Sequence, residues 1–419
     1  MKRLIVKSKH LIYYSFYFVL VFYFLNSEIG MPSFFSYSID VINAIFFIQI
    51  IKHAKRIKYC KDVLIFLVFY VIYTFLTLAI IRQSIMLYLW GLRNNFRFYV
   101  FMIGCILCLH KADIIYFYSK LNIFLYINAV VASIQFILLG YSQDNIGGLF
   151  GSTSGCNGYM NVFLVICCTA NIVKYILKQE KLKKCAIVIA LSSYISIISE
   201  LKSFFVEVGL IIIIAFLITN FSYKKIGIVL LGIASVSIIG VGIGRLYPNW
   251  ANSFSLTAMK EIASSNSGYT SAGDLNRLSA IDSINRRLGT AFPKLIGTGL
   301  GSWEYSGSFH FLNSTFFKQY GNWHYQWISY AWIYLELGYI GLFAFEIFFV
   351  YLFIKNINTS AKSKEDQVIV KTAAILSIMC IFLSIYNVSL RMESAYLIYI
   401  FLAAPFILIK DGLAKCKLK

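Results

Sequence analysis

Long apolar runs, separated by short segments rich in lysine, dominate the pattern of this chain of 419 residues. A helix needs about 20 apolar residues to cross the hydrocarbon layer of a membrane. By this criterion the pattern predicts about twelve spans. They cover residues 11–27, 33–51, 63–81, 96–109, 119–140, 159–177, 184–200, 203–221, 226–245, 325–354, 368–388 and 394–410. We therefore expect an all-α, polytopic integral membrane bundle.

The predicted spans form two groups on either side of one long loop. Residues 1–245 contain about nine spans and residues 323–419 about three, and the intervening residues 246–322 are mostly polar. Within this loop, residues 274–292 show a helical pattern with one apolar face. The apolar positions are Leu275, Leu278, Ile281, Leu288 and Phe292. We expect an amphipathic helix here, with Asp274 capping its start.

The composition agrees with a membrane protein and excludes other classes. Hydrophobic residues make up 59% of the chain and charged residues 13%, whereas a soluble domain carries about 25% charged residues. This composition excludes a soluble enzyme, a disordered chain and a secreted disulfide scaffold. The nine cysteines show no spacing typical of a zinc site or a disulfide framework, so we interpret them as small buried hydrophobic residues.

Membrane topology explains the formal net charge of +20 better than nucleic-acid binding does. If the N-terminus is inside, the cytoplasmic segments hold 24 of the 28 lysines and carry the whole net charge, in agreement with the positive-inside rule. These segments are 1–10, 52–62, 110–120, 174–184, 222–225, 355–371 and 410–419. We therefore expect both termini in the cytoplasm and no nucleic-acid partner.

The arginines are distributed differently from the lysines. Eight of the ten arginines lie on or near the predicted external face, namely Arg82, Arg93, Arg97, Arg245, Arg277, Arg286, Arg287 and Arg391. Arginine is suited to bidentate binding of phosphate or carboxylate. The pattern thus indicates an external site for an anion. The alternative for each single arginine is contact with lipid headgroups or a salt bridge within a loop.

Few other residues of the external face suit acid–base or metal chemistry. His310 and His324 lie in or at the end of the long loop, and imidazole is the usual general base near neutral pH, although a structural hydrogen-bonding role is the alternative. No metal-ligand spacing occurs, so we predict no metal and no cofactor. Charged groups inside spans are costly when they face lipid. We expect the four acids there to face the bundle or a cavity, namely Asp40, Glu207, Glu336 and Glu346.

Several short motifs follow one another in a set order between residues 147 and 342. They are Gly148-Leu149-Phe150-Gly151, Arg277-Leu278, Gly297-Thr298-Gly299-Leu300-Gly301, His324 and Leu335-Glu336-Leu337-Gly338-Tyr339-Ile340-Gly341. Alone, the glycine triplet indicates only a tight turn. In this order, and with the long loop, the motifs resemble the O-antigen polymerase (Wzy) and O-antigen ligase superfamily of bacterial surface polysaccharide assembly. The resemblance covers about half of the chain.

The sequence departs from the pattern of that superfamily at two places. Glu200-Leu201-Lys202-Ser203 stands where the superfamily usually has Ser-Arg at the external end of a span, so Lys202 would replace the arginine. The separation of His324 and Glu336 is about one helical turn longer than usual. His310 therefore competes with His324 for the role of the base.

The resemblance implies a helical bundle of the glycosyltransferase C type. Such an enzyme would catalyse metal-independent, inverting glycosyl transfer on the outer face of the bacterial cytoplasmic (inner) membrane. Its donor would be a glycan linked to undecaprenyl diphosphate. His324 would take the proton of the acceptor hydroxyl, and Arg277 would stabilise the leaving group. The candidates for binding the diphosphate are Lys202, Arg277, Arg286, Arg287, Arg93 and Arg97.

The sequence leaves three functions to be distinguished. The first is a polymerase that joins lipid-linked repeat units of an O-antigen or capsule, together with the chain-length regulator and flippase of the same pathway. The second is a ligase that transfers the finished glycan to lipid A core or another acceptor. The third is a flippase for lipid-linked oligosaccharides, although such proteins have short loops and cations within their spans. A membrane protein with a purely structural role is a further alternative.

Overall fold

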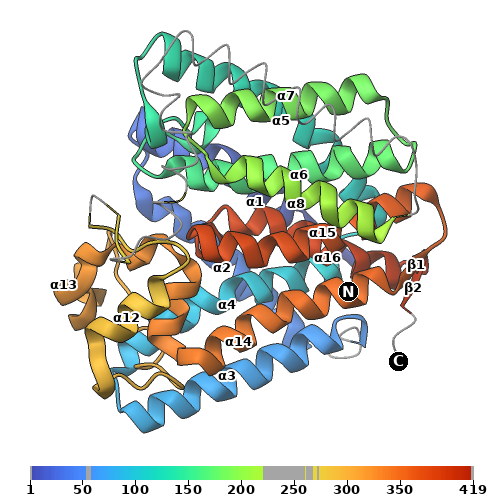
Figure 1. Ribbon diagram of the computed structural model, residues 1–419. Helices are drawn as coiled ribbons and strands as arrows, with labels where there is room; N and C mark the ends of the chain where they lie inside the picture. The colour runs from blue at the N-terminus through green and yellow to red at the C-terminus, as the bar shows by residue number, and fades with distance from the viewer. Residues whose placement is uncertain (1, 53–57, 220–259, 261–267, 271–272, 417–419) are drawn as a thin grey trace.

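A computed structural model describes residues 2–52, 58–219, 260, 268–270 and 273–416, and these residues are mostly helical (Figure 1). Within these ranges, seven helices are long and apolar enough to cross a membrane, and two shorter apolar helices accompany them. The structure therefore supports an all-α membrane protein.

Helices before and after the long loop account for most of the described elements. Those that precede the loop are α1 (Lys2–Ile29), α2 (Ser38–Lys52), α3 (Lys61–Ile81), α4 (Ile85–Cys108), α5 (Lys111–Ile137), α6 (Cys156–Ile176), α7 (Leu182–Ile198) and α8 (Ser203–Ile218). The loop region contains α12 (Ala280–Leu288) and α13 (Thr315–Tyr320). Then follow α14 (Ser329–Ile357), β1 (Thr359–Ala361), α15 (Lys364–Tyr386), α16 (Ala395–Lys410) and β2 (Ala414–Cys416).

Short 3-10 helices connect several of these elements. They are η1 (Ser33–Tyr37), η3 (Gln143–Asn145), η4 (Gly148–Phe150), η5 (Gly289–Ala291), η6 (His310–Leu312), η7 (Gly321–Trp323), η8 (Tyr325–Trp327) and η9 (Ser389–Arg391). The strands β1 and β2 pair in antiparallel register, with Ser360 opposite Lys415.

Most predicted spans overlap a described helix. The exception is the ninth span, 226–245, which lies outside the described residues together with the boundary at residue 245. The fourth span, predicted as 96–109, is longer than expected because α4 already begins at Ile85. Arg93 and Arg97 interrupt the apolar run by which the span is predicted. The helix nevertheless includes both residues, because carboxylates neutralise their guanidinium groups. Twelve membrane crossings remain a prediction.

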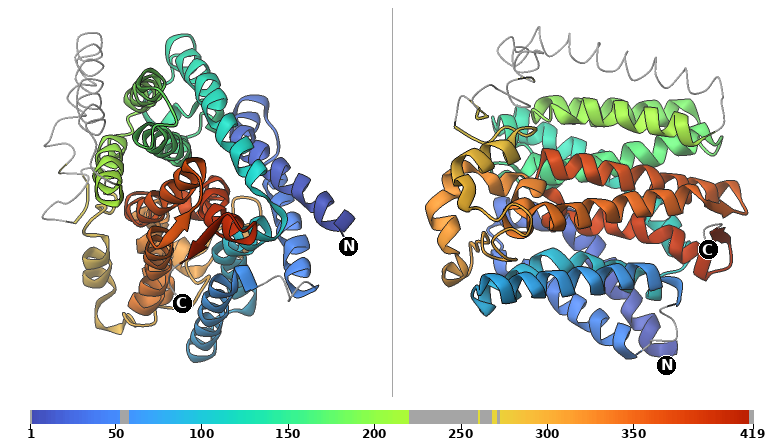
Figure 2. Two further views of the ribbon diagram at one scale, coloured as in Figure 1. Left: turned by 90° about the vertical axis from the view of Figure 1, so that its right-hand side faces the viewer. Right: turned by 60° about the horizontal axis from the view of Figure 1, so that its bottom comes forward.

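The long helices run roughly along one axis and form a bundle (Figure 2). Helices α6 and α15 are largely buried, whereas α3 exposes a row of apolar side chains, with Phe69 68% and Phe75 59% exposed. Such a surface is unfavourable in water and favourable in lipid. The short helices α12 and α13 lie at one end of the bundle, and the β1–β2 pair lies at the other (Figure 1).

Ion pairs and one hydrogen bond, between His110 and Asp411, connect the basic segments at the end of the bundle that carries β1 and β2. Lys111 contacts Glu365 at 2.9 Å and Asp366 at 2.7 Å, and His110 contacts Asp411 at 2.9 Å. Two further pairs are Lys9 with Asp113 and Lys355 with Asp62. These contacts join the segments 1–10, 52–62, 110–120, 355–371 and 410–419, which the charge pattern assigns to a single face. Which face is cytoplasmic remains a prediction.

The amphipathic helix predicted over 274–292 is wrong in its bounds. The observed helix, α12, covers only Ala280–Leu288, and Ser279 precedes it in place of Asp274. The chain before α12 is not helical, because Leu275 forms a β-bridge with Tyr269 and the Asp274 carboxylate hydrogen-bonds the ring of His324. Gly289, at φ 68°, ends the helix well before residue 292. Leu278 of the expected apolar face is 65% exposed.

The described part of the long loop has an apolar core of its own. Trp303 is fully buried and stacks on Phe316 with ring centroids 4.7 Å apart. Its indole nitrogen donates a hydrogen bond to Thr298 at 2.8 Å, and its carbonyl oxygen accepts one from Tyr325 at 2.7 Å. Buried aromatic rings with satisfied polar atoms stabilise a defined conformation. The loop therefore positions side chains over the end of the bundle.

The glycine triplet forms a tight turn that docks on two helices. Gly299 donates from its backbone nitrogen to the carbonyl oxygen of Glu336 at 2.8 Å, and Ile340 donates to Leu295 at 3.1 Å. These bonds occur where α14 is interrupted at Gly338, which has φ 63° and ψ −165°. A backbone group freed by a helix interruption is costly in a membrane protein unless it finds a new partner. The turn supplies those partners.

Gly301 of this turn is expected to tolerate no side chain. Its φ of 91° is unfavourable for other residues, and a Cβ atom would collide with the carbonyl oxygen of Leu87 in α4. We expect Gly301→Ala to destabilise the protein by roughly 2–4 kcal/mol, measured as a lower Tm in detergent. Gly307→Ala is the control, because a Cβ there meets open space; equal Tm values for both variants would contradict the docked turn.

Candidate functional site

A polar cavity of about 460 Å³, which we call the large cavity, lies at the end of the bundle that carries α12. Its walls come from the start of α6, the turn between α7 and α8, the chain before α12, η8 and the end of α15. The lining residues that matter most are Asp144, Gly158, Glu200, Lys202, Asp274, Arg277, Tyr305, Trp327, Tyr386 and Met392. Segments far apart in the sequence thus converge on one site.

Two cations of the large cavity, Lys202 and Arg277, have no carboxylate partner within the described ranges. To the part of the chain that the structure describes, the guanidinium of Arg277 makes one long hydrogen bond, of 3.4 Å, to the carbonyl oxygen of Leu275, and its Nε atom has no hydrogen-bond partner there. Burial lowers the pKa of Arg277, but a guanidinium remains charged in proteins. These groups are available to an anionic ligand.

The backbone around Arg277 fixes its position. The hydroxyl of Tyr330, on the first turn of α14, donates a hydrogen bond of 2.6 Å to the carbonyl oxygen of Arg277. The guanidinium lies 6.0 Å from the ring centroid of Tyr386, at the end of α15. Two helices of the bundle therefore hold a loop arginine against the cavity.

His324 is held beside the large cavity by two of its lining residues. Its Nδ1 atom hydrogen-bonds the Oδ1 atom of Asp274, and its ring stacks on Trp327 with centroids 4.0 Å apart and planes at 2°. The backbone of His324 is left-handed, with φ 53°, which is uncommon for a residue other than glycine. A carboxylate at Nδ1 favours the tautomer in which Nε2 accepts a proton. The arrangement is suited to a general base.

Carboxylates also line the large cavity. Besides Asp274, they are Asp144, which accepts a hydrogen bond of 3.3 Å from Ser154, and Glu200, which has φ 53° in the turn before Lys202. Carboxylate oxygens accept hydrogen bonds from hydroxyl groups. The cavity therefore combines hydrogen-bond acceptors for a hydroxylated ligand with cations that have no carboxylate partner among the residues described.

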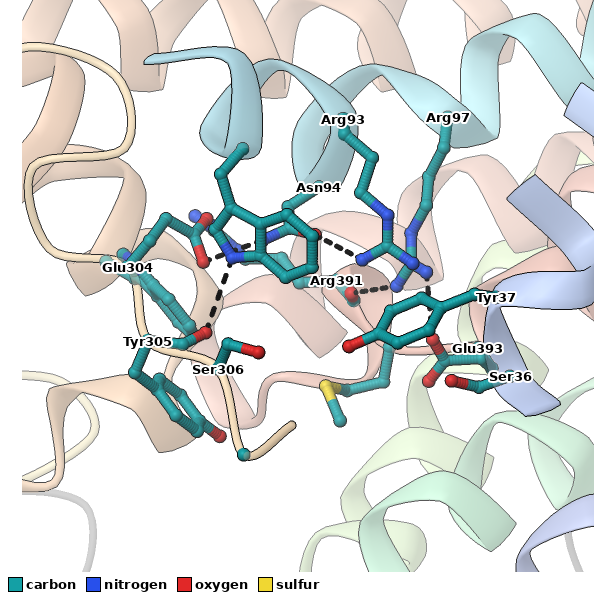
Figure 3. A pocket seen from close by; sticks show the side chains of 14 residues that line it. Ser36, Tyr37, Arg93, Asn94, Arg97, Glu304, Tyr305, Ser306, Arg391 and Glu393 are labelled. Atoms are coloured by element: carbon teal, nitrogen blue, oxygen red, sulfur yellow. Dashed lines mark hydrogen bonds and ion pairs between the residues drawn. The ribbon is translucent and has the colours of Figure 1, made fainter. Parts of the chain in front are cut away.

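A smaller cavity of about 200 Å³, which we call the small cavity, is shown in Figure 3. It adjoins the large one, because Tyr305 and Met392 line both. Three arginines line it, and each has a carboxylate partner. Arg97 donates to Glu393 at 2.8 Å. The other pairs are Arg93 with Asp40 and Arg391 with Glu304. The predicted diphosphate ligands Arg93 and Arg97 thus lie together, but their charges are already neutralised.

Burial and the arginines set the pKa of the two glutamates of the small cavity. Burial raises the pKa of Glu304, and the nearby Arg391 opposes this rise only in part. Burial would also raise the pKa of Glu393, but the charges of Arg97 and Arg93 outweigh it and lower that pKa to about 2. Glu393 is therefore ionised in the folded protein under ordinary conditions.

The buried pair of Arg97 and Glu393 is expected to contribute strongly to stability. Removing one partner of such a pair leaves an uncompensated charge, so Glu393→Gln should cost about 3–5 kcal/mol at pH 7. The folded pKa is depressed, so this contribution is present above the unfolded pKa near 4.5 and is lost as pH falls toward 2. Tm measured in detergent should differ between variant and parent at pH 7, and the difference should shrink below pH 4.5 and vanish only as the pH reaches about 2. A constant difference would contradict this pH dependence.

Three predicted site residues lie away from both cavities. Arg286 donates a hydrogen bond of 3.1 Å to Ser283 within α12, and the guanidinium of Arg287 lies 4.7 Å from the ring centroid of Trp323. His310, in η6, is exposed and is not among the residues that line either cavity. The structure thus brings Lys202, Arg277 and His324 together and leaves these three apart.

The expectation for the acids within the spans is confirmed. Glu207 and Glu336 are fully buried, and Glu207 accepts a hydrogen bond of 2.7 Å from Asn161. Glu346 accepts a hydrogen bond from Ser384 of α15, and Asp40 pairs with Arg93. All four side chains therefore lie against the protein and not against lipid alone. Eight of the nine cysteines are buried and none is disulfide-bonded, as expected.

The Gly148-Leu149-Phe150-Gly151 motif supports the bundle and does not line either cavity. It forms η4, where Gly148 donates from its backbone nitrogen to Gln135 at 2.7 Å and Leu149 donates to Asn128 at 2.8 Å. Both acceptors lie on α5. The motif fixes the chain that enters α6, whose first turn lines the large cavity.

Sequence reasoning missed several residues of the site. Asp274 was expected to cap a helix, and the arginine partners Glu304 and Glu393 were not singled out. Asp274 and His324 are 50 positions apart, so no local spacing links them. A signal existed for Glu393, which follows Arg391 by two residues in a polar break between two apolar runs.

The described residues contain no group of three or more His, Cys, Asp or Glu side chains arranged to hold a metal ion. Comparison of the chain with models of known protein families gives no match, and comparison with curated proteins gives no similar sequence. The function is therefore inferred from the two cavities themselves.

Proposed function

We propose that the protein is a membrane glycosyltransferase that polymerises an O-antigen or capsular polysaccharide. It would transfer the growing glycan from undecaprenyl diphosphate to the non-reducing end of a lipid-linked repeat unit on the external face of the inner membrane. The observation that carries the proposal is the large cavity, where two cations without a carboxylate partner among the described residues lie beside a histidine that an aspartate contacts. A helical bundle of the glycosyltransferase C type with about twelve spans is part of the proposal.

The cations suit the leaving group of this reaction. When the bond between the anomeric carbon and the diphosphate oxygen breaks, negative charge develops on that oxygen. Preorganised cations in a water-poor site stabilise such charge without a metal ion. Arg277 can bind a phosphate through two nitrogen atoms, and Lys202 can add a point charge. The lipid tail would remain in the bilayer beside the cavity.

The histidine suits the acceptor. An acceptor hydroxyl attacks the anomeric carbon from the side opposite the diphosphate, forms the new C–O bond and inverts the configuration. Its proton passes to Nε2 of His324, and Asp274 stabilises the imidazolium that results. The diphosphate leaves with the bonding electron pair. Each element of this step has a residue in or beside the large cavity.

The same chemistry would serve a ligase, in which the acceptor is lipid A core or another glycan. A flippase is less well supported, because it needs no general base and the Asp274–His324 pair would have no role. We favour the polymerase because polymerases vary more in sequence than ligases, and this chain departs from the superfamily pattern at Lys202 and in the separation of His324 and Glu336.

Reconstitution of the purified protein tests the proposal. Vesicles containing the protein would be supplied with undecaprenyl-diphosphate-linked repeat units, and the products would be separated by gel electrophoresis. A polymerase gives a ladder of lipid-linked glycans in the presence of EDTA. A product formed only when lipid A core is added would indicate the ligase. Movement of the lipid across the bilayer without a new glycosidic bond would indicate the flippase.

A further inference from the structure

The small cavity differs from the large one in how its charges are matched. Its three arginines lie opposite three carboxylates, with Arg97 and Glu393 separated by 2.8 Å. A fourth carboxylate, Glu336, lies 3.6 Å from Arg391. Arg97 and Arg391 each retain one buried nitrogen without a hydrogen bond. The cavity thus offers donors and acceptors but no excess positive charge.

This charge balance selects the chemistry of a ligand. An anionic ligand would have to compete with carboxylates that already neutralise the arginines, and desolvating an unpaired charge is costly. An apolar ligand would leave the polar walls without partners. A ligand with several hydroxyl groups, each of which donates and accepts, matches closely spaced donors and acceptors of both signs.

The lining residues add to this match. The rings of Tyr37 and Trp90 line the cavity, and the Arg93 guanidinium lies 5.0 Å and 4.9 Å from their centroids. The polar side chains of Asn94 and Ser306 also line it (Figure 3). Binding sites for small ligands commonly combine aromatic walls with a few oriented polar groups. A volume of about 200 Å³ has room for a ring but not for a chain.

The position of the small cavity connects it to the reaction. Tyr305 and Met392 form a wall common to both cavities. A ring held in the small cavity therefore lies next to the site where Lys202 and Arg277 would hold a diphosphate. The donor glycan extends away from its diphosphate as a chain, which the small cavity cannot hold. The acceptor instead ends at the single sugar whose hydroxyl attacks the donor.

We propose that the small cavity binds the non-reducing terminal sugar of the acceptor and that this sugar is uncharged. The identification of this sugar as part of the acceptor rests on the proposed function. The preference for a neutral sugar rests on the paired charges of the small cavity alone. The small cavity would thus select the sugar to which the next unit is joined, and the large cavity would bind the lipid diphosphate whatever its glycan.

Two glycines allow each cavity to be filled separately. Gly307 lines the small cavity and Gly158 lines the large one, and a Cβ atom at either position meets open space. Neither residue has a left-handed backbone conformation. Gly307→Trp should therefore occupy the small cavity, and Gly158→Trp the large cavity, without backbone strain.

Binding to the purified protein in detergent tests the inference without turnover. The probes are a panel of neutral monosaccharides (glucose, galactose, mannose, rhamnose, N-acetylglucosamine and N-acetylgalactosamine), glucuronate and galacturonate, and inorganic pyrophosphate. Saturation-transfer NMR reports sugar binding, and broadening of the phosphorus signal reports pyrophosphate binding. We expect at least one neutral sugar to bind. We expect both uronates to bind more weakly than that sugar. Gly307→Trp should weaken sugar binding at least tenfold and leave pyrophosphate binding intact, and Gly158→Trp should do the reverse.

The outcomes separate this inference from the proposed function. Retained pyrophosphate binding shows that Gly307→Trp is folded. Tighter binding of a uronate, sugar binding that survives Gly307→Trp, or no binding of any sugar in the panel would overturn the inference. Neutral-sugar binding with the expected variant pattern, in a protein that forms no polymer from lipid-linked repeat units, would uphold a neutral-sugar site in the small cavity and refute the polymerase.

Discussion

Replacement of His324 by glutamine should lower the rate of glycan transfer by about 10²–10⁴-fold, which is the usual contribution of a general base. Glutamine keeps a polar side chain of similar length but cannot take the proton of the acceptor hydroxyl. Asp274→Asn should also lower the rate, because the carboxylate that orients Nδ1 is lost. The measurement is the initial rate of polymer formation in vesicles at equal protein content.

Trp327→Phe serves as the control for His324, because a phenyl ring preserves an aromatic face against the imidazole. This variant should retain most of the activity. If His324→Gln and Asp274→Asn remain active while His310→Gln is inactive, the base is His310 and the site lies elsewhere in the loop.

Replacement of Arg277 by alanine should lower the rate by about 10²–10³-fold, the usual effect of removing a group that stabilises charge in the transition state. The guanidinium has no carboxylate partner among the residues that the structure describes, so its removal should affect Tm little. Arg277→Lys should restore part of the activity, because an ammonium keeps the charge but loses the bidentate geometry.

The matched control for Arg277 is Arg287→Ala, on α12. Arg287 is also a loop arginine, but it stacks on Trp323 and does not line the large cavity. Its replacement should leave the rate within a few-fold of the parent. Equal loss of activity in both variants would show that general positive charge of the loop matters and not the cavity.

The helices of the bundle could be predicted because their signal is local. An apolar run of about 20 residues identifies a span wherever its neighbours lie, and described helices overlap the predicted spans outside 226–245. The start of α4 could not be predicted, because Arg93 and Arg97 interrupt the run and are neutralised by residues far away in the sequence. A charge is compatible with a helix in the bundle only when such a partner exists.

The site was harder to predict because its contacts are not local. The motif pattern grouped Arg277, Lys202 and His324, and these residues do converge on one cavity. The same pattern could not separate Arg277 from Arg286, although the two differ in whether they line the cavity or bond within α12. The sequence shows how many charged side chains there are. Whether one of them can bind a ligand depends on whether another residue already pairs with it. That information exists only in the folded structure.

The glycine turn has a consequence for how the site is assembled during synthesis. The turn packs against α4, which is made before it, and completes the hydrogen bonds of α14, which is made after it. The loop therefore cannot reach its final position when it first emerges from the ribosome. It can do so only after α14 has entered the membrane. Assembly of the region around the two cavities is thus a late event in synthesis, because it must wait for the insertion of α14, which only α15 and α16 follow among the α-helices described.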